Sequence, residues 1–239
     1  MMLLLPALTF AMETLSNFHY AIHSWSAYHV WRPVWDISHP ASEVLWGLAI
    51  LASTYAVYVY FHRGGREYDG ISLPEPTWTI WKIAIFTVIL TWGVDLGVER
   101  LLETRIELPD TWPTKPDWYY HITPAMLPGT LFAAVIVAPL VEEYLFRGLG
   151  MGCLLERGWS PVIVVLVTSA LFAFTHTQYL PSGMFLIFVS GVIFGYLRLV
   201  SGALTLPVIS HALLNLSIYV WYAAEGFPSI YDGPSQSLY

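Results

Sequence analysis

The chain has 239 residues, of which 56% are hydrophobic and only 11% are charged, and its mean hydropathy is +0.58. Soluble globular domains carry about 25% charged residues, so this composition excludes an ordinary soluble domain and predicts an integral membrane protein. The net charge of −7 comes without a basic face, which argues against nucleic acid as a partner. The single cysteine, Cys153, excludes a disulfide within the chain.

Residues 1–120 are predicted to hold an interfacial segment, two membrane-spanning helices and a polar loop. Residues 1–12 are apolar but too few to cross a bilayer, so we expect an interfacial or short embedded helix there, with an uncleaved signal anchor as the alternative. Residues 13–40 are rich in His, Trp and Tyr, which is typical of the same interface. Apolar runs over 41–61 and 77–101 predict the first two spans, and 102–120 forms a polar connection punctuated by proline.

The second half is predicted to be a helical core over 121–226, followed by a tail over 227–239. Four further apolar runs cover 122–155, 161–180, 182–200 and 204–224. The first of these is too long for one straight crossing and contains three prolines, so we expect an irregular start and a regular helix from near Gly129. The predicted fold class is therefore all-α, a polytopic transmembrane bundle of about six spans plus the interfacial helix.

Two adjacent carboxylates and one arginine lie within the long apolar run. A charge at the centre of a membrane helix costs roughly 2.5–3.5 kcal/mol by the gentler estimates, so such residues are usually functional. Glu143 and Arg147 stand at i and i+4, the spacing of a same-face ion pair that would compensate the buried arginine. Glu142 is turned about 100° away from that pair, which leaves it free to face a cavity as a general base toward water.

Helical rise brings further polar residues near the two glutamates. Ser160 as N-cap and Pro161 at the first helical position predict a tight turn between two helices. His176 then lies level with the glutamates, at roughly 22–26 Å from that membrane face. On the last span, His211 and Asn215 repeat the i, i+4 spacing and offer two hydrogen-bond donors, as an oxyanion hole requires, although at a looser match of roughly 12–18 Å.

Three segments together resemble the ordered motifs of the type II CAAX prenyl endopeptidase family, also called the CPBP or Abi family. They are Glu142-Glu143-Tyr-Leu-Phe-Arg147, Phe172-Ala-Phe-Thr-His176 and His211-Ala-Leu-Leu-Asn215. The resemblance covers about 125–225 and implies an intramembrane protease of the glutamic type. It implies that Glu142 and His176 activate the water and that His211 and Asn215 stabilise the oxyanion. Glu143, Arg147 and Phe172 would then support the site structurally.

The most direct interpretation is an endopeptidase that cleaves near the terminus of a membrane-associated protein or peptide. We expect no cofactor, the lipid bilayer as surroundings, and the plasma (inner) membrane of a prokaryote as location. One alternative makes Glu142, His176 and His211 ligands of a hydrolytic zinc ion, although the sequence lacks His-Glu-x-x-His. Another is a non-catalytic membrane binding or immunity protein, or a proton-coupled carrier that uses the same buried groups.

Overall fold

The computed structural model describes residues 44, 47–48, 50–56, 59, 77–103, 127–176, 179 and 181–225. The expectations for residues 1–40, for most of 41–61, for the connection beyond residue 103 and for the 227–239 tail fall outside these residues. Every regular element in the described part is a helix, in agreement with the predicted fold class.

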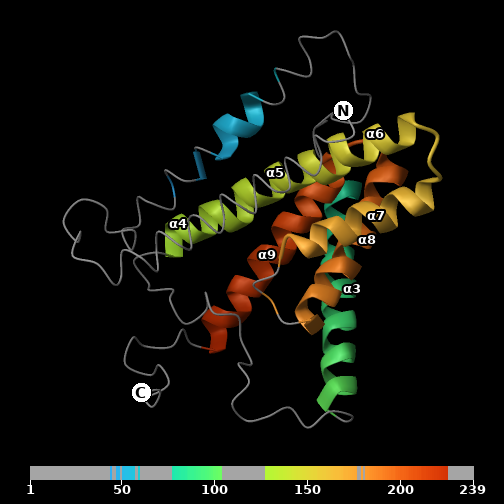
Figure 1. Cartoon of the computed structure of the whole chain (residues 1–239). Coiled ribbons are helices and arrows are strands. Elements are labelled where there is room, and N and C mark those ends of the chain that lie inside the picture. Colours follow the sequence, from blue (N-terminus) through green and yellow to red (C-terminus); the bar gives the residue numbers. More distant parts are fainter. Residues whose placement is uncertain are drawn as a thin grey trace, which may run out of the picture.

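The helices follow one another with few intervening residues. The described elements from residue 78 onward are α3 (Trp78–Glu103), α4 (Leu127–Leu131), η2 (Phe132–Val137), α5 (Ala138–Glu143), η3 (Tyr144–Gly150), α6 (Met151–Glu156), α7 (Pro161–Phe174), α8 (Pro181–Ser201) and α9 (Thr205–Glu225). The elements from α4 to α6 form one continuous long helix, in which η2 and η3 are π-helical (Figure 1). Helices α7 and α8 lie side by side, and α9 runs next to α5 (Figure 1).

Four of these helices are long and apolar enough to cross a membrane. They cover Trp78–Gly97, Leu127–Glu156, Gly183–Ser201 and Thr205–Ala224, and correspond to four of the predicted spans. Because a transmembrane helix needs about 20 apolar residues, these lengths indicate an integral membrane protein.

The predicted span over 161–180 is wrong in its second part, because α7 ends at Phe174 after 14 residues. Its start agrees with the prediction: Ser160 is the N-cap, its hydroxyl accepts a hydrogen bond from the Ile163 N–H, and proline follows. At its end, Thr175 Oγ1 donates to the Phe172 carbonyl oxygen over 2.7 Å. Side chains that bind backbone carbonyls in this way compete with helix continuation. At about 1.5 Å per residue, 14 residues fall short of the hydrocarbon core.

The long helix is helical from Leu127, close to the expected start near Gly129, and it carries π-helical turns inside. The expected irregular start at residues 122–126 lies outside the described residues. Near η2 the Ala138 N–H donates to the Ala133 carbonyl, five residues back. The next donor would be residue 139, but this is Pro139, which has no N–H. The Ala134 carbonyl therefore lacks its donor within the helix, and it must find one on a neighbouring element.

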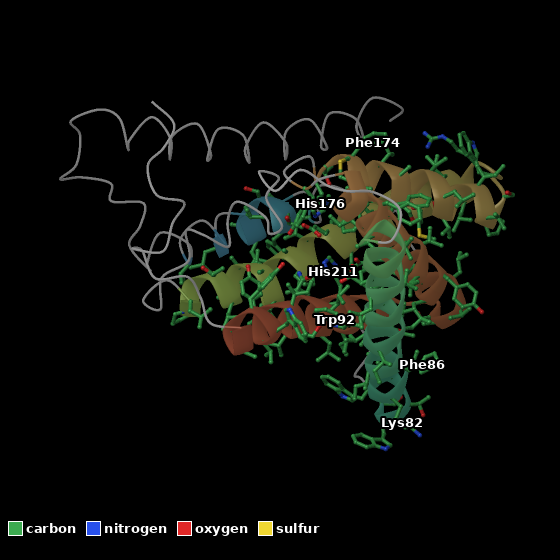
Figure 2. The ribbon with its side chains drawn as sticks, turned by 90° about the horizontal axis from the view of Figure 1, so that it is seen from below. Lys82, Phe86, Trp92, Phe174, His176 and His211 are labelled. Carbon is green, nitrogen blue, oxygen red and sulfur yellow. The ribbon has the colours of Figure 1, made fainter. Side chains whose placement is uncertain are left out.

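Helix α3 packs against α8 and α9 through a cluster of apolar residues separate from the core around α5. The buried members of this cluster are Ala84, Phe194, Leu197, Leu206 and Leu214. A cross-helix hydrogen bond adds to it, because the Trp92 indole N–H donates to Ser217 Oγ over 2.8 Å. Lys82 and Phe86, on the outer face of α3, point away from the remaining helices (Figure 2).

Candidate active site

Glu143 is the centre of the polar cluster in the bundle. Its side chain is 0% exposed, and its Oε1 accepts from Arg147 Nη1 over 3.1 Å and from His211 Nδ1 over 3.0 Å. The ion pair with Arg147 is the one that the i, i+4 spacing predicts. The bond to His211 was not predicted, and it joins α9 to α5 inside the protein.

Glu142 faces the same histidine from its other side. Its Oε2 lies 3.7 Å from His211 Nε2, and its side chain is 18% exposed, in contrast to the fully buried Glu143. The two carboxylates differ in direction by the expected turn of about 100°, yet both lie near α9. The imidazole of His211 lies between them, with one nitrogen toward each. Since a carboxylate oxygen accepts, the Nδ1–H of His211 points at Glu143, and Nε2 is directed toward Glu142.

Arg147 is also fully buried and links the cluster to α8. Its Nη2 donates to the Gly191 carbonyl over 3.0 Å, while Nη1 holds Glu143. The guanidinium carbon lies 4.5 Å from the centre of the Phe172 ring and 5.7 Å from that of Phe194. A desolvated cation over aromatic faces gains up to about 2 kcal/mol, so these rings replace part of the hydration that burial removes.

His176 lies just past the end of α7, whereas the sequence predicts it on the helix itself. Its Nδ1 is 2.8 Å from the Phe172 carbonyl oxygen, and because a carbonyl only accepts, Nδ1 carries the hydrogen. Its Nε2 has no hydrogen-bond partner among the described residues.

Phe172 stands between the two histidines. Its ring centre is 4.7 Å from that of His176 and 5.9 Å from that of His211. Figure 2 shows both histidines in the middle of the molecule, beside the long helix. Among the described residues no hydrogen bond or ion pair joins His176 to either glutamate. Its link to the cluster is the ring of Phe172, which contacts both histidines.

Asn215 makes a contact that the motif did not reveal. Its Nδ2 donates to the Ala134 carbonyl over 2.7 Å, the oxygen that Pro139 leaves without a donor. One of its two amide hydrogens is thereby engaged, and the other is available. Pro139 was the signal in the sequence that one helix carbonyl lacks a donor, but α-helical spacing would place that carbonyl at Val135, and only the π-helical turn moves it to Ala134.

A bound metal ion would need several ligating side chains around one point. Within the described residues no group of three or more His, Cys, Asp or Glu side chains is arranged to hold one. The zinc alternative would need Glu142, His176 and His211 in such an arrangement.

The comparison with protein families decides the relationship of this cluster to known proteins. Residues 124–217 match the family model described as Type II CAAX prenyl endopeptidase Rce1-like. The chain carries a domain of this family. The matched residues include both glutamates, both histidines and Asn215. Together with the candidate spans, they form a CPBP-family membrane protease domain. Comparison with curated proteins gave no match, and comparison with solved structures gave none.

Proposed function

We propose that the protein is an intramembrane endopeptidase in which Glu142 activates the hydrolytic water. The observation that carries this proposal is the asymmetry of the two carboxylates. Glu143 is fully buried and already engaged by Arg147 and His211, whereas Glu142 is partly exposed and 3.7 Å from His211 Nε2. A general base must reach both a water and the reacting group, and of the two only Glu142 is accessible.

In the proposed reaction the water oxygen attacks the scissile carbonyl carbon while its proton passes to Glu142. His176 helps to activate the water through Nε2, since its Nδ1 is bonded to the Phe172 carbonyl. The developing oxyanion accepts from Nε2 of His211 and from the second amide hydrogen of Asn215. When the C–N bond breaks, the proton held by Glu142 goes to the leaving amine.

The supporting residues act by holding these groups in place. Glu143 fixes the direction of His211 through the 3.0 Å hydrogen bond, and Arg147 fixes Glu143. We assign both, with Phe172, to positioning rather than to contact with substrate. The proposal extends to the substrate class: a membrane-associated protein or peptide, cut near its terminus, in the plasma membrane of a prokaryote. No bound cofactor takes part in this scheme.

Hydrolysis in heavy-oxygen water tests the proposal for any substrate that the membranes contain. Membranes with the wild type or Glu142→Gln at equal amounts are incubated in H₂¹⁸O, and peptides are analysed for C-termini that have gained ¹⁸O. We expect labelled C-termini that depend on the wild type and are absent with Glu142→Gln, since the glutamine cannot accept the water proton. The same labelled set with both proteins would overturn the glutamate mechanism.

Two further arms separate the alternatives. Loss of labelling when a zinc chelator is added, and its return with zinc, would favour the metal-dependent mechanism. If Glu142→Gln restores every phenotype of cells that lack the protein, and neither form produces a labelled peptide, the protein acts by binding. The position of the labelled C-terminus in its precursor shows whether the cut lies near an end.

A further inference from the structure

Gly191 on α8 lies against the guanidinium of Arg147, the group that also binds Glu143. Its carbonyl accepts from Arg147 Nη2 over 3.0 Å. A Cβ atom at this position would lie 3.2 Å from the same Nη2, and 3.0 Å and 3.2 Å from the Cβ and Cα of Ser169 on α7. The side chain of Arg147 is 0% exposed and packs against aromatic rings, so any shift of its guanidinium changes these contacts.

From Gly191 a chain of direct contacts leads to the accessible carboxylate. Arg147 binds the Gly191 carbonyl with Nη2 and Glu143 Oε1 with Nη1. That same Oε1 accepts from His211 Nδ1, and the other nitrogen of the imidazole faces Glu142. A displacement of the guanidinium by a few tenths of an ångström is therefore passed to Glu143 and from there to His211.

The sequence offers a different reason for a glycine here, because Gly191 and Gly195 form a Gly-x-x-x-Gly pair typical of close helix packing. Gly195 fits that reason alone. The three atoms nearest to a Cβ there all belong to the Val165 side chain, whose two methyl carbons would lie at 3.1 Å and 3.3 Å. Both glycines are crowded by α7, Gly191 by Ser169 and Gly195 by Val165, but a Cβ at Gly191 would in addition lie against a side chain of the site, that of Arg147.

We infer that Gly191 is a positioning residue of the active site: its missing side chain leaves the room in which Arg147 sets Glu143 and, through it, His211. The effect on catalysis rests on the proposed function. The effect on the geometry of His211 does not, and the two can be measured separately.

The geometric effect is measured by NMR of the purified protein labelled with ¹⁵N-histidine. The Nδ1–H signal of His211 is assigned by its loss in His211→Gln. We expect Gly191→Ala to shift or broaden this signal, and Gly195→Ala, the control that adds the same methyl group against α7 one turn further along α8, to leave it unchanged. An unchanged signal in Gly191→Ala would overturn the inference, whether or not the protein is a protease.

The catalytic effect is measured as the rate of ¹⁸O incorporation into new C-termini, per folded protein. Misplacement of a catalytic group by about 1 Å can cost about 10²-fold, so for a shift of a few tenths of an ångström we expect Gly191→Ala to lose between about 3-fold and 10-fold relative to Gly195→Ala. Equal rates for the two variants, with a wild type that labels and a Glu142→Gln that does not, would leave the proposed function standing and overturn the inference.

A double substitution keeps the test decisive if Gly191→Ala folds poorly. Arg147→Lys removes Nη2, the atom that the new methyl group would approach. In this background we expect Gly191→Ala to cost no more, in rate and in the His211 signal, than Gly195→Ala does. An added loss of the same size as in the wild-type background would mean that Gly191 acts through helix packing, and would overturn the inference.

Discussion

His211 and Glu143 are 68 positions apart in the chain and share a buried hydrogen bond of 3.0 Å from Nδ1 to Oε1. This bond couples α9 to the long helix at the point where Arg147 also binds. One carboxylate oxygen thus serves two donors from two elements. The other carboxylate oxygen of Glu143, Oε2, has no hydrogen-bond partner among the described residues. The hydrogen bonds to Arg147 and to His211 therefore both depend on the single atom Oε1.

The two adjacent glutamates should respond differently to the same substitution. Glu143→Gln removes the charge that compensates fully buried Arg147, and breaking a buried pair costs about 3–5 kcal/mol. Glu142→Gln changes a partly exposed group and should leave thermal stability close to that of the wild type while it abolishes ¹⁸O incorporation. Thermal unfolding of both variants in detergent checks this contrast. Equal losses of stability would contradict it.

Asn215 and Pro139 should be coupled. Asn215→Ala leaves the Ala134 carbonyl without a donor, which costs about 1–3 kcal/mol. Pro139→Ala supplies a backbone N–H to the same oxygen, so we expect Asn215→Ala to cost clearly less in the Pro139→Ala background. A double-mutant cycle of unfolding free energies measures the coupling. Additive effects would show that the side chain stabilises the protein in another way.

Phe172→Leu should slow the reaction per folded protein and lower the free energy of unfolding only moderately. The ring lies against Arg147 and both histidines, and leucine keeps most of the apolar volume but offers no aromatic face. We expect a loss of up to about 2 kcal/mol in stability from the cation contact, together with a slower rate per folded protein. Phe185→Leu, on the exposed face of α8, is the control and should change neither quantity. A rate equal to that of the control would exclude a positioning role for Phe172.

Trp92→Phe should loosen α3 without affecting chemistry. It deletes the hydrogen bond to Ser217 and leaves an aromatic ring near Trp221, whose ring centre lies 5.6 Å away. The expected cost is about 0.5–1.5 kcal/mol in unfolding free energy, with an unchanged rate of ¹⁸O incorporation per folded protein. A matching fall in rate would mean that α3, which lies outside residues 124–217, contributes to the site.

Much of the fold follows from local sequence rules. Apolar length locates α3, α8 and α9, and the Ser160–Pro161 pair fixes the start of α7 because capping and proline geometry are local. The Glu143–Arg147 pair follows from i, i+4 spacing in the same way. Gly202, with a φ of 67°, makes the turn that the sequence places between the last two helices.

The contacts between helices did not follow from the sequence, since they depend on how far each helix is rotated and shifted against its neighbour. The bond from His211 to Glu143 needs a register between α9 and α5 that rise per residue alone gave only loosely. Helix α7 ends where the side chains of Thr175 and His176 bind the Phe172 carbonyl. Hydropathy does not predict these hydrogen bonds.

The six residues of α5, which end with the two glutamates, lie between π-helical stretches on either side. A π-helical turn holds one more residue than an α-helical turn, so the direction in which each glutamate points depends on how many residues precede it as well as on which residues they are. Deleting one alanine from η2 would turn all that follows by about 100° while leaving every polar residue of the cluster in the chain. If the proposed function holds, such a deletion should abolish the activity although every motif remains in the sequence.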